Sequence, residues 1–157
     1  MSSVYFPHTG KKDEEVEAMY AATDADSVAS RSRGAVILVG GDFNAEVGAK
    51  QQGEDESIIG KHAEGPRNRR GEMMAKWAWD RKLVIAKCLF EKPWAKKWTH
   101  RRKERERVID YFCVGKKMRG AVLNVEVWPE INLGSDHRAV KMSMRIGGTE
   151  ESKKEEA

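Results

Sequence analysis

Two short stretches of this sequence place an acidic side chain beside an amide or an imidazole, and a third holds an aspartate within an apolar run. They contain five candidate site residues: Asp42, Asn44, Asp110, Asp136 and His137. Carboxylate oxygens are good ligands for Mg²⁺. A carboxylate can also orient an attacking water, an amide can hold a phosphate oxygen, and an imidazole can protonate or stabilise the charge that develops. Taken together, these residue types suit the hydrolysis of a phosphodiester.

Each stretch also has a purely structural interpretation. Asp42 and Asn44, which precede a Gly-rich segment, are typical of an Asx-turn that ends a strand, and Asp136 with His137 could cap a loop. Asp110 has apolar neighbours on both sides, so it is either exposed on an outer face or a buried charge that needs a partner. The three stretches together favour a shared site in which Asp110 fixes the ring orientation of His137.

The apolar pattern predicts strands at the positions that would carry these residues. The continuous apolar run at 35–40 indicates a strand buried on both faces, and it ends just before the first aspartate. Asp110 falls within a second predicted strand at 107–114. The aspartate–histidine pair precedes a third, at 139–146, which alternates apolar and polar residues. Strand ends on a rigid sheet can hold polar side chains in fixed geometry around a cleft.

The other predicted elements lie between these strands. Amphipathic helices are expected at 13–30 and 70–81, and the polar, Gly-rich segment 45–68 is expected to be a long loop over the surface. Further strand segments are expected at 3–7, 83–86, 98–99 and 121–128, with a charged turn at 101–106 joining the strand at 98–99 to the one at 107–114.

Charge is concentrated in one part of the chain. The net charge is +4 over 157 residues, but segment 67–107 holds fifteen Lys or Arg residues, five acidic residues and four of the five tryptophans. A basic strip with aromatic residues suits a nucleic-acid partner, although a solvated face with a few core tryptophans has the same composition. No apolar run reaches the roughly 18 residues of a membrane span, and the N-terminus lacks a signal-peptide pattern. We therefore expect an intracellular protein with no membrane partner.

The motifs around these residues resemble those of a known superfamily. Gly-Asp-Phe-Asn-Ala (41–45), Ile-Asp-Tyr-Phe (109–112) and Gly-Ser-Asp-His-Arg-Ala-Val (134–140) are similar to motifs of the endonuclease/exonuclease/phosphatase superfamily. The nearer likeness is to the endonuclease domain of non-long-terminal-repeat retrotransposons and to craniofacial development protein 2-like proteins. It covers about residues 3–146 and includes shorter motifs at 4–7, 68–71 and 98–99.

The resemblance implies an α/β fold, a four-layered α/β sandwich of the DNase-like type. It also implies that Asp42 orients or deprotonates the attacking water and that Asn44 holds the scissile phosphate. Asp136 would join the network of metal and water, and His137, oriented by Asp110, would contact a phosphate oxygen. The cofactor would be Mg²⁺, with Mn²⁺ as the alternative, and the substrate would be DNA.

The resemblance extends to residues around this centre. Tyr5 would supply a hydroxyl on the phosphate side. Substrate contacts are expected from five further residues: Asn68, Arg70, Trp98, Arg101 and Arg102. One departure concerns the position after Trp98-Thr99, where the subgroup usually carries an aromatic residue and this chain has His100 followed by three cations. A basic hairpin tip still suits contact with a DNA backbone.

By this resemblance, residues 1–147 correspond to the C-terminal part of the domain. Residues 148–157 offer no apolar anchor, so we expect them to form a disordered tail. The superfamily's N-terminal half supplies an asparagine and a glutamate that is a principal metal ligand, and nothing before Tyr5 can replace them. Without the missing strands, this half would expose a large apolar patch. We therefore expect the isolated chain to be weakly stable, with little or no nuclease activity. The partners, besides DNA, would be the missing half or a reverse transcriptase in a longer protein.

Three functions are compatible with these patterns. A DNA endonuclease of retrotransposon type leads, and it would work in the nucleus. A phosphatase of the same superfamily would need a deep pocket instead of a broad basic surface. A catalytically inactive remnant would retain only the binding of nucleic acid or protein, and salt-sensitive DNA binding without activity would identify it.

Overall fold

The computed structural model describes residues 2–8, 10–32, 37–128 and 136–145. A mixed four-stranded sheet lies at its centre, in the order β1-β2-β6-β3. Its members are β1 (Ser2–Tyr5), β2 (Leu38–Asp42), β6 (Asp110–Gly115) and β3 (Leu83–Ile85). β1 runs parallel to β2, while β6 is antiparallel to both of its neighbours. The strand expected at 35–40 starts at Leu38 within the described residues and continues to Asp42.

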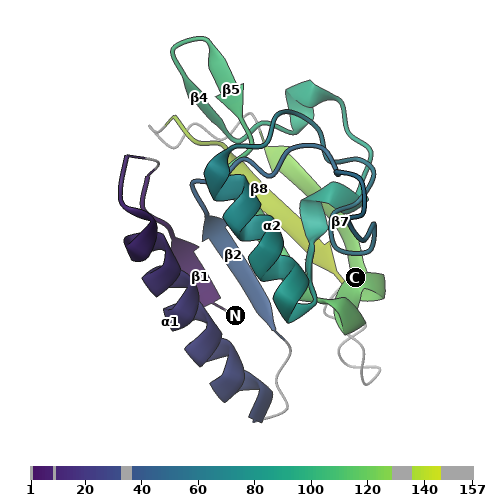
Figure 1. The fold of residues 1–157 in the computed structure, drawn as a ribbon. Helices are drawn as coiled ribbons and strands as arrows, with labels where there is room; N and C mark the ends of the chain where they lie inside the picture. Colours follow the sequence, from purple (N-terminus) through teal and green to yellow (C-terminus); the bar gives the residue numbers. More distant parts are fainter. Residues whose placement is uncertain (1, 9, 33–36, 129–135, 146–157) are drawn as a thin grey trace.

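Two helices pack against one face of this sheet (Figure 1). α1 (Asp13–Ser32) and α2 (Arg69–Arg81) confirm the helices predicted at 13–30 and 70–81. Acidic residues in the first turn of α1 stabilise the helix, because their negative charge interacts favourably with the positive end of the helix dipole. The core beneath the helices contains aromatic and aliphatic side chains from helices, strands and loops, including Phe6, Val39, Phe43, Met74 and Trp77.

A second, two-stranded sheet covers the opposite face of the central sheet. It consists of β7 (Val122–Trp128) and β8 (Ala139–Met144), which pair antiparallel. Leu83 and Ile85 of β3 belong to the core on the helix side, whereas Val84 belongs to a second cluster with Val125 and side chains of β8. Successive side chains of a strand point to opposite faces. The described residues therefore form three layers: helices, central sheet and second sheet.

The segment between β2 and α2 differs from its prediction as a surface loop. It has no strand or helix within 43–68, as expected, but Val47, Ile58 and Ile59 are buried in the helix-side core. The N-terminus of α2 also lies directly against it, because a Cβ on Gly71 would stand 1.8 Å from the carbonyl oxygen of Glu46. The apolar residues are too widely spaced in the polar segment to reveal this burial by periodicity.

The basic hairpin also differs from its prediction. The structure has β4 (His100–Arg102) and β5 (Arg105–Arg107), which occupy most of the turn expected at 101–106, and β6 starts separately at Asp110. The strand expected at 98–99 is wrong, because these two residues lie outside any strand. The break has a local cause, since the Thr99 hydroxyl oxygen accepts hydrogen bonds from the N–H groups of Ile109 and Asp110 at 3.1 and 3.2 Å. The hairpin projects from the upper end of the sheet in Figure 1.

Short 3₁₀ helices complete the described chain: η1 (Ala86–Leu89), η2 (Trp94–Lys96) and η3 (Lys116–Ala121). The predicted tail at 148–157 lies outside the described residues. Within the described ranges, none of the helices combines the length and apolar character needed to cross a membrane.

Candidate active site

The segment Gly41–Asn44 ends β2 in a tightly fixed turn. Gly41 has a φ of 146°, and a Cβ there would stand 2.0 Å from the carbonyl oxygen of Val4 in β1, so only glycine fits. Asp42 accepts a hydrogen bond from the backbone N–H of Asn44 through Oδ1, at 2.8 Å. Asn44 is left-handed, with a φ of 45°, and its side-chain amide donates to the Phe6 carbonyl at 2.6 Å. The Asx-type turn is present, and it uses Oδ1 of Asp42 while Oδ2 faces His137.

Asp110 and His137 form the expected couple. Nδ1 of His137 lies 2.9 Å from Oδ2 of Asp110, and Nε2 lies 3.5 Å from Oδ2 of Asp42. The two aspartates are paired residues of adjacent antiparallel strands, which sets their separation. A carboxylate at Nδ1 places the proton on that nitrogen and fixes the ring, so Nε2 is directed toward the Asp42 carboxylate.

The environment of Asp42 changes its acidity. Burial raises the pKa of Asp42 above its ordinary value, the hydrogen bond from Asn44 lowers it in part, and the nearby charge of Asp110 raises it again. A carboxylate with a raised pKa is a better proton acceptor than an ordinary surface aspartate. Asp42 therefore has the environment expected of a general base.

Asp136 contacts His100, a residue that the sequence analysis did not assign to the site. His100 is buried, and its Nε2 lies 3.1 Å from Oδ2 of Asp136. A backbone hydrogen bond within Asp136 lowers the pKa of its carboxyl, and His100 contributes in the same direction. Burial lowers the pKa of His100, with Arg107 acting in the same sense. The only sequence signal was the departure from the subgroup's usual residue after Thr99.

Tyr5 lies at the edge of this cluster. It is the last residue of β1, its Cα pairs with that of Asp42, and it is 71% exposed. Its hydroxyl is therefore open to a ligand on the same end of the sheet. The role of Tyr5 as a phosphate-side hydroxyl stays a prediction.

The side chains present fit a divalent cation. Two groups could hold one: Asp42, Asp110 and His137, and His100, Asp136 and His137. In each group the three ligand atoms lie within 4.8 Å of one another. Carboxylates supply the hard oxygen donors that Mg²⁺ and Mn²⁺ take. The side chain of Asp136 is 57% exposed and thus accessible to an ion from solvent.

Solved structures share this arrangement of strands and helices. The 3′-5′ exonuclease NExo from Neisseria meningitidis matches with a TM-score of 0.64 and 18% identity, over 92% of this chain and 60% of its own. The catalytic domain of Xenopus laevis APE2 matches with a TM-score of 0.54 and 16% identity, over 93% of this chain and 50% of its own. The endonuclease domain of TRAS1, a telomere-specific non-LTR retrotransposon, matches with a TM-score of 0.51 and 17% identity, over 82% of this chain and 52% of its own.

The chain has the endonuclease/exonuclease/phosphatase fold. The α/β fold class expected from the motifs is thereby confirmed. Among curated proteins, craniofacial development protein 2 is 29% identical in Tragulus javanicus and 28% identical in Bos taurus, each over 113 residues. These matches cover 71% of this chain but 19% of each relative, so the chain spans about a fifth of their length. No protein-family model matches the sequence.

Within this fold, Asn68 and Arg70 have structural contacts. Asn68 caps α2: its Oδ1 accepts from the N–H groups of Gly71 and Glu46 at 2.8 and 3.1 Å. Arg70 is buried, donates to the carbonyl of Lys11 and lies 3.0 Å from Asp13. These contacts engage the polar atoms that substrate binding would need. Direct substrate contact by Asn68 and Arg70 stays a prediction.

The other predicted substrate residues belong to the hairpin of the same fold. Two guanidinium groups lie over the Trp98 ring, with Arg101 at 4.5 Å and Arg138 at 3.9 Å from its centre. Arg101 also pairs with Glu106 across the hairpin. Arg102 is exposed on β4. The hairpin therefore presents cations to solvent while Trp98 anchors its base.

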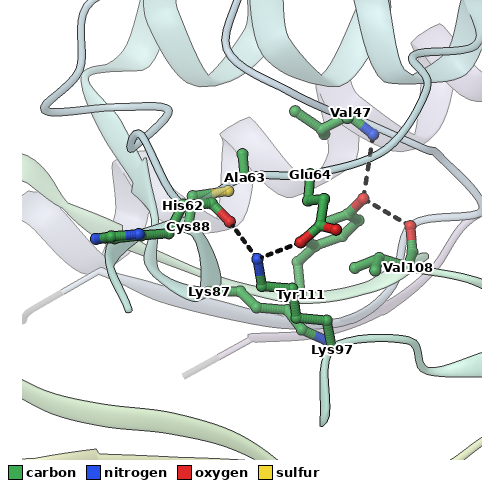
Figure 2. Close-up of a pocket in the computed structure, with 10 residues that line it drawn as sticks. Val47, His62, Ala63, Glu64, Lys87, Cys88, Lys97, Val108 and Tyr111 are labelled. Carbon is green, nitrogen blue, oxygen red and sulfur yellow. Dashed lines mark hydrogen bonds and ion pairs between the residues drawn. The ribbon is translucent and has the colours of Figure 1, made fainter. Parts of the chain in front are cut away.

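The structure also contains a small cavity, whose lining includes Lys87, Lys97 and Tyr111 (Figure 2). It has a volume of about 30 Å³, and none of the candidate catalytic residues lines it. At its wall the Lys97 ammonium donates to the carbonyl of His62 and to Glu64 at 2.7 and 2.8 Å. The Tyr111 hydroxyl is held by backbone groups, including N–H of Val47. The amine of Lys87 is buried in this region without a hydrogen-bond partner among the described residues.

Proposed function

We propose that this chain contributes the water-activating and phosphate-binding residues of a metal-dependent phosphodiesterase that cuts DNA, as an endonuclease of the retrotransposon type. The observation that carries the proposal is the contact of His137 with two aspartates, at 2.9 Å from Asp110 and 3.5 Å from Asp42. Asn44 stands two residues from Asp42 on the same turn. This set combines a proton acceptor, an amide donor and an oriented imidazole at one end of a rigid sheet.

Each side chain would perform one part of the hydrolysis. The Asp42 carboxylate, with its raised pKa, would take the proton of the attacking water. Asn44 would donate to a phosphate oxygen through the amide N–H that does not bind Phe6. His137 in its doubly protonated form, with the Nδ1–H group on Asp110, would donate to a second phosphate oxygen from Nε2 and offset the charge that develops there. Mg²⁺ or Mn²⁺, held by Asp136, would supply further neutralisation of the phosphate charge.

The proposed substrate is a nucleic acid and not a small phosphate ester. A small-molecule phosphatase needs a pocket that encloses its substrate. The structure has a cavity of about 30 Å³ and a larger hollow of about 480 Å³ lined by Asn68 and Arg70, but neither is lined by a candidate catalytic residue. Beside the site, β4 and the turn that follows it expose three consecutive cations: Arg101, Arg102 and Lys103. Exposed cations on a projecting hairpin suit a phosphate backbone.

The proposal is tested by nicking of supercoiled plasmid in Mg²⁺ or Mn²⁺. We expect the 157-residue chain to nick slowly at most, and any nicking to fall at least a hundredfold in Asp42→Asn and His137→Ala. The matched control is His62→Ala, which removes an imidazole outside the candidate site. Equal nicking by the wild type and both site variants would overturn the assignment. Fast nicking that both variants abolish would instead contradict the expectation of low activity in the isolated chain.

The second candidate is a binding protein without catalysis. It is supported by the exposed basic hairpin, which needs no intact catalytic centre. DNA binding that weakens steeply with salt, with no cutting at any metal concentration, would favour it. A protein of either kind that acts on genomic DNA would work in the nucleus.

A further inference from the structure

His100 and His137 are brought together by the backbone as well as by their side chains. They form an isolated antiparallel bridge between the first residue of β4 and the segment before β8. Arg101 N–H donates to the carbonyl of Asp136 at 3.0 Å, and Arg138 N–H donates to that of Thr99 at 2.7 Å. The two rings lie 4.8 Å apart, centre to centre. Main-chain hydrogen bonds therefore fix the backbone positions of both histidines.

We propose that His100, Asp136 and His137 bind a transition-metal ion of the Zn²⁺ class. Ligand atoms of these three residues lie within 4.8 Å of one another, and Nε2 of His100 is already 3.1 Å from Oδ2 of Asp136. In a tetrahedral site with metal–ligand bonds of about 2.0–2.1 Å, ligand atoms are about 3.3 Å apart. Small side-chain rotations would bring the three ligands to that spacing and leave a fourth position open.

The donor chemistry favours zinc over magnesium at this group. Two imidazoles and one carboxylate are a ligand set for Zn²⁺, Co²⁺ or Ni²⁺, whereas Mg²⁺ takes oxygen ligands in octahedral geometry. Asp110 completes the arrangement, because a carboxylate on the Nδ1 side of a ligating histidine orients the ring and makes it a better ligand. The other group, Asp42 with Asp110 and His137, has two carboxylates and suits a harder ion.

Arg107 opposes metal binding in a way that can be tested. Its guanidinium lies 3.2 Å from Nδ1 of His100. Because a guanidinium can only donate, that contact leaves the ring proton on Nε2, the nitrogen that faces Asp136. A metal ion at Nε2 requires the proton to move to Nδ1 and the Arg107 contact to be lost. Removing the guanidinium should therefore strengthen metal binding at His100.

Occupancy by zinc would regulate the proposed reaction. His137 and Asp136 would be engaged by the ion and unavailable to phosphate and Mg²⁺, so Zn²⁺ would inhibit nicking. This inhibition rests on the proposed function, but the metal binding itself does not. A failure to nick DNA would leave the zinc site intact, and a failure to bind zinc would leave the nuclease proposal intact.

The test is a calorimetric titration of the 157-residue chain with ZnCl₂, with folding of each variant checked by circular dichroism. We expect one ion per chain, at least tenfold weaker binding in His100→Phe and His137→Phe, and tighter binding in Arg107→Met. His62→Ala is the matched control and should bind as the wild type does. Unchanged affinity in the folded His100→Phe protein, or weaker binding in Arg107→Met, would overturn the proposal.

A second measurement uses the wild type alone, so it does not depend on the variants folding. Co²⁺ at one equivalent should give the intense visible absorption of a four-coordinate ion. Adding Zn²⁺ should shift the ring signals of His100 and His137 in NMR spectra and leave those of His8 and His62 in place. Shifts confined to His8 or His62, or none at all, would refute the site.

Discussion

Asp42 is a buried carboxylate whose pKa is raised mainly by burial, with a contribution from the charge of Asp110. A carboxyl group with a higher pKa in the folded than in the unfolded state binds more protons when folded, so stability falls as pH rises through that range. We expect Asp42→Asn, which keeps the acceptor for the Asn44 N–H, to unfold at a higher urea concentration than the wild type at pH 7. At pH 3 the difference should shrink, because Asp42 is then largely protonated in both states. Lower stability of the variant at pH 7 would contradict this account.

Gly41 is constrained by its neighbour strand more than by its own conformation. A Cβ there would overlap the Val4 carbonyl at 2.0 Å, so we expect Gly41→Ala to lower the free energy of unfolding by about 3 kcal/mol or more. Gly53 separates the two causes, since it also has a positive φ, of 85°, but no atom within 4 Å of its added Cβ. Gly53→Ala should cost about 1 kcal/mol. Equal costs in urea unfolding would show that backbone conformation alone matters at Gly41.

At the scale of elements, α2 depends on its N-cap. Asn68 satisfies two N–H groups, one in α2 and one in the preceding loop, so Asn68→Ala should cost about 2 kcal/mol in urea unfolding. Asn68→Ser can still cap the helix and should cost less. DNA affinity of the folded Ser variant decides between cap and substrate contact: unchanged affinity supports the cap alone, and a marked loss would give Asn68 the predicted second role.

Elements with a regular apolar pattern were predictable from the sequence. The periodicity around Met74 and Trp77 marks α2, and the apolar run ending at Gly40 marks β2. The bounds of the hairpin strands were not predictable, because the break before Asp110 depends on the Thr99 hydroxyl, whose contacts span ten and eleven residues with no pattern of their own. The Asp110–His137 contact followed from chemistry, since an aspartate inside an apolar strand needs a partner. The contact of His100 with Asp136 could not be predicted in this way, because only the folded chain brings the two residues together.

At the scale of the whole molecule, the central sheet separates two apolar clusters, and each carries part of the stability. Polar groups inside this arrangement must find partners, and most do. Lys87 is an exception: its amine is buried without a hydrogen-bond partner among the described residues. Burial lowers the pKa of Lys87 to about 7, and the charge of Asp110 opposes the shift. The molecule therefore carries a destabilising group whose effect depends on pH.

The direction of that dependence follows from proton binding. The unfolded chain holds the Lys87 proton up to its ordinary pKa near 10.5, whereas the folded chain releases it near 7, so the free energy of unfolding rises with pH between these values. Lys87→Met keeps the apolar stem, removes the amine and should stabilise the protein at pH 7 by on the order of 3 kcal/mol. The gain should shrink steadily toward pH 9.5 in urea unfolding. Lys61→Met, at an exposed lysine, should show no such trend. A gain that does not change with pH would mean that Lys87 stays charged in the folded protein.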